Sequence, residues 1–279
     1  MVALALLSVS AASQKQMTDA QSENLKGKVQ EVVNERAGLE LKDGKWNALN
    51  RRVSSITTYG AQGNRLTVKF YDDRGNLSTT ISYFEIDGLR AMSRQFIRQS
   101  YDPPPMAAPP QAASAPSDPR YDIKHIDKYD DHGRRSEVLM IGNDGKVTSL
   151  LVSKFDEKIH QTESEQWSRM DELQRMYGMS DSTRKLDKLP RRFVEVDNRK
   201  IEMGLNSRSV YRYGEQDNLI ESFSLDDSGV PKYHTQYEQY EFDANGNWTK
   251  RTRFRVAFKD WKQVLTPEAI EYQAIKYHP

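Results

Sequence analysis

Hydrophobic and polar residues alternate along most of the chain between residues 53 and 258. Leu66, Val68 and Phe70 fall on one face of an extended segment, and Thr67 falls on the other. A period of two is expected of a β-strand with one buried face, whereas a helix repeats every 3.6 residues. The pattern recurs between turn-like segments, so it predicts a string of short antiparallel strands.

A short cassette separates the predicted strands. It begins with an aromatic or aliphatic residue, continues with three residues that often include Asp, and ends with Gly, often Asn, and an apolar residue. The clearest copies run from Tyr71 to Leu77 (YDDRGNL) and from Phe242 to Trp248 (FDANGNW). Gly adopts a positive φ without steric cost, and Asp can accept a hydrogen bond from an amide two residues on. We therefore expect each cassette to form a hairpin loop with a G1 bulge.

Weaker copies of the cassette are regularly spaced, and they begin at Tyr59, Tyr129, Ile141, Tyr213 and Leu225. In the copy that begins at Tyr213, Asp217 stands where Gly is expected. Pairs of copies start twelve residues apart, which suggests three related blocks near 53–99, 121–170 and 192–258. The predicted fold is all-β, an antiparallel β-meander of repeated hairpins that forms a curved or partly closed sheet.

A proline-rich stretch interrupts the strand pattern. Residues 100–120 contain seven of the eleven prolines in the chain. Proline lacks the amide hydrogen that a sheet requires and favours an extended backbone, so we expect a linker or long loop here. A ligand for an SH3-like domain is the alternative interpretation. The stretch separates N-terminal β repeats at 25–99 from C-terminal β repeats at 121–279.

The two ends of this region are predicted to be strands as well. Residues 25–36 and 46–58 are expected to pair through a turn at 42–45, where the sequence reads KDGK. Residues 267–277 contain good helix formers and follow Thr266, which can serve as an N-cap. A final strand is nevertheless favoured for this segment, on the family resemblance described below.

Residues 162–190 carry two competing patterns. Trp167, Met170 and Leu173 have helical spacing, although the block pattern predicts a strand through this region. We expect a strand over 163–170 that leads into a helical or irregular excursion over 180–190.

The composition is polar for a folded protein. Of the 279 residues 37% are hydrophobic and 29% are charged, and the mean hydropathy is −0.82. The 14 Tyr, 9 Phe and 4 Trp are too many for a disordered chain, and sheets with one hydrated face reconcile these facts. The net charge is +1 with no basic stripe, so a nucleic-acid partner is not expected. The absence of cysteine excludes disulfides and thiolate chemistry.

The N-terminus resembles the end of a secretory signal. Residues 2–7 are apolar, and small residues follow at 8–13, so cleavage is expected near Ala11 or Ala12. We interpret residues 1–12 as a signal-peptide-like segment; an apolar, frayed terminus is the alternative. No later segment has the ~18–20 apolar residues of a membrane-spanning helix. The prediction is an exported bacterial protein, periplasmic or extracellular.

Known catalytic and metal-binding motifs are missing from the sequence. The five histidines show no metal-binding spacing, and no GxSxG, P-loop or GxGxxG sequence occurs. The paired acidic residues of the cassettes lack the closing Glu of an EF-hand loop, and turn formation already explains them. We therefore predict no catalytic residue, no metal and no cofactor.

Tyrosines are concentrated late in the chain. Cross-strand packing accounts for them in the simplest interpretation, with their hydroxyls reaching water. The functional interpretation is an aromatic surface that binds a glycan or a peptide. The candidate binding residues are Tyr211, Tyr213, Tyr233, Tyr237 and Tyr240.

The cassettes resemble YD repeats of the RHS type. The similarity rests on the copy at 71–77 and on the run 240–251 (YEFDANGNWTKR), and it extends to the leading LKGKV at 25–29. The set of cassettes is similar to the short arrays of such repeats in exported bacterial proteins of unassigned role. The resemblance implies a β-meander in an envelope or secreted protein, with a last strand near Ile270 to Tyr272, and it carries over no catalytic residue.

Three functional hypotheses follow from the sequence. The preferred one is a non-enzymatic, exported envelope protein that binds or scaffolds a protein or glycan ligand through its sheet surface. The alternative is an immunity or adaptor protein associated with a toxin or a secretion system. An enzyme acting on glycans is the third hypothesis. The sequence leaves the ligand and the oligomeric state open.

Overall fold

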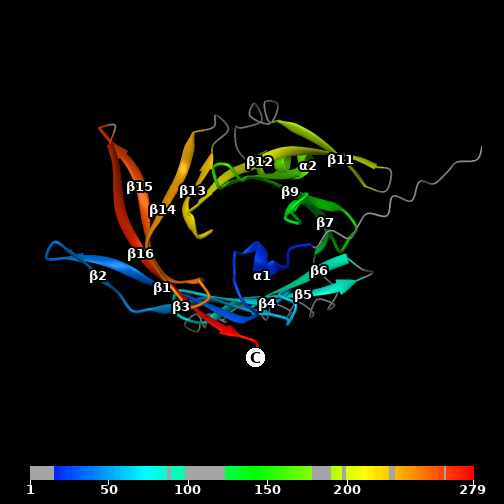
Figure 1. Ribbon diagram of the computed structural model, residues 1–279. Coiled ribbons are helices and arrows are strands. Elements are labelled where there is room, and N and C mark those ends of the chain that lie inside the picture. The colour runs from blue at the N-terminus through cyan, green and yellow to red at the C-terminus, as the bar shows by residue number, and fades with distance from the viewer. Residues whose placement is uncertain are drawn as a thin grey trace, which may run out of the picture.

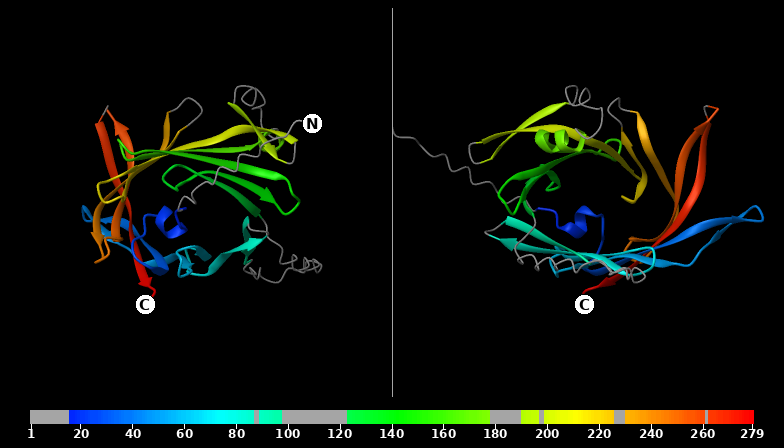
Figure 2. Two further views of the ribbon diagram at one scale, coloured as in Figure 1. Left: turned by 45° about the vertical axis from the view of Figure 1, so that its right-hand side comes forward. Right: turned by 180° about the vertical axis from the view of Figure 1, so that it is seen from behind.

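The computed structural model describes residues 16–86, 89–97, 123–177, 190–196, 199–225, 230–260 and 262–279. Over these residues fourteen antiparallel strands close into a barrel (Figure 1). A short helix, α1 (Asp19–Ser22), lies inside the ring in all three views (Figure 1 and Figure 2).

The strands follow one another around the barrel almost in chain order. Those of the first half are β1 (Val29–Lys42), β2 (Lys45–Ala48), β3 (Arg52–Tyr59), β4 (Arg65–Tyr71), β5 (Leu77–Ile86), β6 (Leu89–Phe96), β7 (Ile123–Tyr129) and β8 (Arg135–Gly142). Those of the second half are β9 (Val147–Asp156), β10 (Gln161–Arg169), β11 (Arg191–Val196), β12 (Arg199–Tyr213), β13 (Leu219–Leu225), β14 (Pro231–Phe242), β15 (Trp248–Lys259) and β16 (Lys262–Tyr277). A second helix, α2 (Met170–Tyr177), follows β10.

Two long-range pairings close the sheet. β1 pairs with β16, and β10 pairs with β12 as well as with β9. β2 and β11 remain outside the ring, hydrogen-bonded to β1 and β12 respectively. The all-β antiparallel prediction is confirmed, but the expected curved or partly closed sheet is wrong, because the barrel is closed. Both predicted repeat regions belong to this one sheet, since β6 pairs with β7.

The predicted hairpin turns are confirmed at six cassettes. In each of them the amide of the first turn residue donates a backbone hydrogen bond to the carbonyl four residues later, as in Asp72 N to Asn76 O at 2.9 Å. Gly75 has φ +83°, and Asp217, which replaces Gly, has φ +59°. The carboxylate of Asp72 accepts hydrogen bonds from the amides of Arg74 and Asn76. The acidic residues are therefore turn formers, as predicted.

The ambiguous segments also adopt defined structures. Residues 161–169 form a strand and 170–177 a helix, in the predicted order; most of the expected excursion over 180–190 lies outside the described residues, as does the linker at 100–120. The C-terminal segment is a strand, as favoured. Pro267 lies in it at a register irregularity opposite Phe254, where a missing amide is tolerated. The turn at 42–45 is confirmed, but the predicted strand at 46–58 is divided into β2 and β3.

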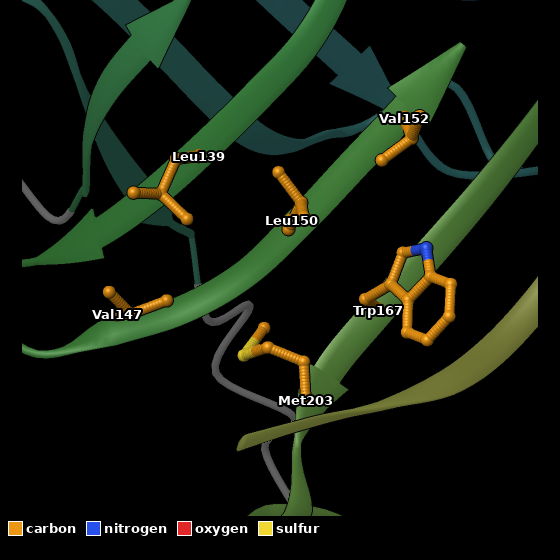
Figure 3. Close-up of a cluster of buried hydrophobic side chains, with 6 residues drawn as sticks. All are labelled: Leu139, Val147, Leu150, Val152, Trp167 and Met203. Carbon is orange, nitrogen blue, oxygen red and sulfur yellow. The ribbon is translucent and has the colours of Figure 1, made fainter. Parts of the chain in front are cut away.

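A cluster of apolar side chains covers part of the outer wall (Figure 3). Its buried members are Leu139, Val147, Leu150, Val152, Trp167 and Met203. Val138 of β8 is the cross-strand partner of Asp127, which faces the helix in the ring. Leu139 is the next residue along β8, so its side chain points outward. Val194 of β11 packs on this cluster, and α2 contacts β10 and β12. β11 thus covers part of this outward-facing cluster.

Among the described residues, no helix is long and apolar enough to span a membrane.

Candidate functional site

The N-terminal segment lies inside the barrel, against its turns. We call residues 16–28 the plug; it contains α1. Thr18 caps this helix, because its hydroxyl accepts a hydrogen bond from the amide of Gln21 while the Gln21 side chain accepts one from the amide of Thr18. Figure 2 shows the helix within the ring of strands in both of its views.

Four cassette turns hold the plug. The amide of Met17 donates to Gly133 O at 2.9 Å, and the amide of Ala20 donates to Gly63 O at 3.0 Å. Asn24 Nδ2 donates to the carbonyl of Asp217 at 2.9 Å.

The fourth turn binds the plug through the buried amide side chain of Asn247. Asn247 Oδ1 accepts from the amide of Lys26 at 2.7 Å, and Asn247 Nδ2 donates to the carbonyl of the same residue at 2.9 Å. The turns predicted from the sequence therefore have a second role, as the rim that binds the plug.

The plug carries a buried charge into the barrel. Asp19 is 1% exposed, and its carboxylate accepts hydrogen bonds from Arg90 Nη1 at 2.6 Å and from the amide of Arg65 at 2.7 Å. Arg135 Nη2 lies 3.3 Å from the same carboxylate. Burial by itself raises the pKa of Asp19, but the hydrogen bonds from Arg90 and Arg65 outweigh it, so the pKa lies below its usual value. Asp19 is therefore ionised at neutral pH and ties three strands to the plug.

A pocket of about 570 Å³ lies between the plug and β4 to β8. Plug residues 16–18 form one wall, and the barrel contributes among others Arg65, Tyr83, Glu85, Arg90, His125, Asp127, Tyr129 and Arg135. Several buried polar atoms here have no hydrogen-bond partner among the described residues: Arg65 Nε, both ring nitrogens of His125 and Asp127 Oδ1. Burial lowers the pKa of His125, so its ring is neutral at neutral pH. These atoms are shielded from the pocket as well as from water, and the pocket itself is lined by both acidic and basic side chains.

A second, smaller pocket of about 230 Å³ lies between plug residues 22–25 and β12 to β15. Arg251 lines it, with its guanidinium 4.1 Å from the ring centre of Tyr237 and 4.2 Å from that of Trp248. Glu271 Oε2 accepts a hydrogen bond from Arg251 Nε at 2.8 Å. The arginine is thus held in one orientation by two aromatic faces and one carboxylate.

Four of the five tyrosines proposed from the sequence lie on the inner face of the barrel. Tyr213 lines the smaller pocket, Tyr237 and Tyr240 contact Arg251, and Tyr211 shares the face of Tyr213 in β12. Burial raises the pKa of Tyr213 and of Tyr240. The fifth, Tyr233, is 70% exposed and does not line either pocket.

The residues of the larger pocket were missed by sequence reasoning. Asp19 lies outside every predicted strand, and Arg65 sits beside a turn where a bulge changes the alternation. One signal was available: Arg90 shares its strand face with Met92, a core residue, although a charged residue in that position is unusual.

The outer face carries ion pairs between neighbouring strands. Lys128 pairs with Glu137 at 2.7 Å and Arg212 with Glu221 at 2.7 Å, each directly opposite in register. Lys250 and Glu241 form a third such pair. These charged side chains point away from the interior, on the face that also carries the apolar cluster. The exterior of the barrel is therefore both charged and apolar.

No cluster of His, Cys, Asp and Glu in the described part of the chain could hold a metal ion.

Comparison with known proteins places the chain in no family. No family model matches it, and no curated protein matches it. Among solved structures, a porin-like protein from Bacteroides uniformis aligns with a TM-score of 0.41 and 8% identity, over 90% of this chain and 99% of that one. A protein of unknown function from Bacteroides fragilis aligns with a TM-score of 0.30 and 10% identity, over 55% of this chain and 91% of that one.

Proposed function

We propose that the protein is a non-enzymatic, exported bacterial envelope protein that binds a polar ligand on the inner face of its barrel. The observation that carries the proposal is the distribution of side chains between the two faces. Tyrosines, arginines and carboxylates line the interior, where two pockets adjoin the plug. Concave sites with a few convergent polar groups are the usual form of a ligand-binding site.

The charged exterior favours a barrel that stands in water. A membrane-spanning barrel presents an apolar band of about 25 Å to lipid, and a charge at its centre costs ~2–4 kcal/mol. Glu165, in the middle of β10, faces outward opposite Val152 and pairs with Arg208 of β12 at 3.2 Å, so a charged pair lies where such a band would be. We therefore propose a location in the periplasm or outside the cell rather than within a bilayer.

The paired charges of the interior argue for binding rather than catalysis. Arg90, Arg135 and Arg251 each have a carboxylate partner. A general acid or base requires a proton that it can exchange near neutral pH, and Asp19, whose pKa is lowered, does not provide one. The signal-like residues 1–12 support export.

The proposal is tested by fractionating cells that make the full-length chain. We expect a processed form that osmotic shock releases without detergent. Purified protein should then show a ligand-dependent rise in its thermal midpoint when it is screened against envelope glycans and peptides. Unprocessed protein in the cytosol, or extraction that requires detergent, would contradict the proposed location.

The inner face is tested by a variant. Tyr237→Ala removes one of the two rings that hold Arg251, and it should reduce ligand-dependent stabilisation if the ligand enters the smaller pocket. Tyr233→Ala is the matched control, because this tyrosine is exposed and lies outside both pockets.

A further inference from the structure

We infer that one end of the barrel, opposite the turns that hold the plug, docks on the surface of an anionic phospholipid membrane. The inference goes beyond the proposed binding on the inner face, because it concerns a different surface. It is carried by the position of the exposed apolar side chains, by the form of two hairpins and by the lysines beside them.

The strand order assigns every turn to one of two ends. Antiparallel strands that are adjacent in the chain are joined at alternate ends of a barrel. The four turns that hold the plug, at residues 60–64, 130–134, 214–218 and 243–247, therefore share one end. The hairpins β1–β2 and β15–β16 lie at the other end, which we call the free rim. Its described residues are 39–52, 70–77, 94–97, 142–147, 191–196, 199–202, 230–233, 256–260 and 262–265.

Exposed apolar side chains are concentrated on the free rim. Of the fifteen large hydrophobic side chains that are exposed in the described structure, eleven lie there. Phe96 and Phe258 are each 68% exposed. On a soluble protein such side chains are usually scattered singly, and their concentration on one part of the surface marks a contact site. The uneven distribution therefore indicates a partner at the free rim.

The β1–β2 hairpin is amphipathic and extends beyond the ring. β1 pairs with β16 as far as Gly38, and its last four residues, about 13 Å of strand, pair only with β2. One face of the hairpin consists of Leu39, Leu41, Trp46 and Ala48, and the other of Glu40, Lys42, Lys45 and Asn47. Leu41 and Trp46 are directly opposite each other, and both are exposed. The apolar face is thus left open to water along its outer part.

The β15–β16 hairpin ends on a similar sequence. It reads KDWK at 259–262, and the β1–β2 hairpin reads KDGK at 42–45. Lys42 lies directly opposite Lys45, and the two lysines of the second tip are opposed in the same way. Like charges in this position destabilise a hairpin, and no ion pair among the described residues involves any of the four lysines. An anionic surface outside the protein would relieve the repulsion at both tips.

Cations also accompany exposed rings elsewhere on the free rim. Lys200 Nζ lies 4.3 Å from the ring centre of Phe193, and Lys232 Nζ lies 5.9 Å from that of Tyr233. In a membrane interface, aromatic rings lie at the level of the headgroups, and lysine extends its alkyl chain over apolar surface while its ammonium group reaches the phosphates. The paired side chains of the free rim have the composition that such an interface favours.

The arrangement fits a lipid surface better than a protein partner. The two hairpins part beyond Gly38 and Ala269, and in every view they extend past the ring on the same side of it (Figure 1 and Figure 2). A protein partner requires one continuous patch of matching shape, whereas a membrane surface is continuous and deformable and can meet both tips. Two lysines and one aspartate give each tip a net charge of +1, so the preferred surface is anionic.

Docking at one end leaves the barrel wall in water. It requires no apolar band around the strands, and contact through a few side chains is reversible. The inference is therefore compatible with release of the protein by osmotic shock without detergent.

The experiment measures binding of the full-length processed protein to vesicles by flotation and by tryptophan fluorescence. The vesicles consist of phosphatidylcholine alone or of equal parts of phosphatidylcholine and phosphatidylglycerol. We expect binding to the anionic vesicles to be about tenfold tighter than to the neutral ones and to weaken in high salt.

Two double variants separate the apolar contribution from the charge. Trp46→Ser with Phe258→Ser should weaken binding to the anionic vesicles by about tenfold or more, because two exposed rings no longer enter the interface. Lys42→Gln with Lys259→Gln should weaken it by about tenfold and leave binding to neutral vesicles unchanged.

The matched control is Ile159→Ser with Lys158→Gln. Both side chains are exposed in the turn between β9 and β10, at the end that holds the plug, so their loss should not change vesicle binding. Circular dichroism and the urea midpoint establish that each variant is folded. If the Trp46→Ser variant does not fold, the lysine variant and its salt dependence decide the question.

Three outcomes would overturn the inference. Absence of vesicle binding, or equal binding to neutral and anionic vesicles, would refute it. An equal loss of binding in the control variant would show that the contact is not at the free rim. A dimer in analytical ultracentrifugation that Trp46→Ser with Phe258→Ser abolishes, without vesicle binding, would assign the free rim to a second copy of the chain. Ligand-dependent stabilisation, which the proposed function requires, is measured separately and should be the same in all of these variants.

Discussion

At the scale of single residues, the plug depends on a few side chains that are buried at the barrel rim. Asn247 is 3% exposed and uses both ends of its amide to hold the backbone of Lys26. Asp19 is 1% exposed and holds the opposite side of the plug through Arg90 and Arg65. Because each group is hydrogen-bonded and removed from water, replacing one leaves its partners with unsatisfied atoms.

The first prediction concerns the charge of Asp19. Asp19→Asn retains the size of the side chain but removes the buried charge that pairs with Arg90 and contacts Arg135, so we expect a loss of about 3 kcal/mol in the free energy of unfolding at pH 7. The folded-state pKa of Asp19 is lowered, so its contribution is complete above the unfolded value of about 3.8 and disappears as the pH falls through the folded value. The difference between variant and wild type should shrink toward pH 2.

Urea unfolding at several pH values measures this effect. Asp130, Asp243 and Glu137 also have lowered pKa values, so the wild-type protein loses stability in acid for several reasons, and only the difference isolates Asp19. Asp73→Asn, at an exposed turn position, is the control and should change little. A constant difference between pH 7 and pH 2 would contradict the assignment.

At the scale of elements, the same turn serves two purposes. Gly63 and Gly145 both occupy the left-handed position of a cassette turn, with φ of +83° and +73°. Around Gly145 there is open space, whereas a Cβ atom on Gly63 would lie 2.8 Å from Thr18 Oγ1 of the plug. The turn at Gly63 therefore requires glycine for its backbone and again for the approach of another segment.

The second prediction compares these two glycines. Gly145→Ala should cost about 1 kcal/mol, the backbone penalty alone. Gly63→Ala should cost clearly more, because Thr18 caps α1 and cannot rotate away without losing that bond. Urea unfolding gives the stability, and the rate of tryptic cleavage at Lys26 reports release of the plug. Equal costs, with equal cleavage rates, would show that the plug does not rest on this turn.

At the scale of the whole molecule, closure depends on contacts between strands that are distant in the chain. β1 and β16 bring the two ends of the described sheet together, and β10 bypasses β11 to pair with β12. A closed barrel removes the exposed edges that an open sheet would present. It also creates the interior in which the plug and both pockets lie.

The third prediction tests closure directly. The chain has no cysteine, so Ser164→Cys combined with Ser209→Cys introduces the only two thiols. These positions face each other across β10 and β12, and we expect a disulfide to form in the folded protein under mild oxidation. Loss of free thiols and faster migration in a non-reducing gel would show it.

The control pair is Ser164→Cys with Ser222→Cys, which places the second thiol one strand further around the barrel. This pair should remain reduced in the native state. If neither pair forms a disulfide until the protein is unfolded, the β10–β12 pairing is refuted.

Much of the local structure was predictable because it depends on neighbouring residues. The turn at Asp217 was predicted despite its missing glycine, since Asp tolerates the same φ. The inward position of Tyr211 and Tyr213 follows from strand alternation once the interior is known. The YD-type resemblance and the export signal stay predictions.

The amino-acid sequence by itself determined the strands, the hairpin turns and the division of side chains between two faces. These follow from the period of two and from the backbone requirements of Gly and Asp, both of which act within a few residues. Only the tertiary structure decided which face is the interior, that the sheet closes, and that Asp19 of the plug meets Arg90 and Arg135. Those contacts join segments up to 116 residues apart, and their energy comes from burial that no local pattern records.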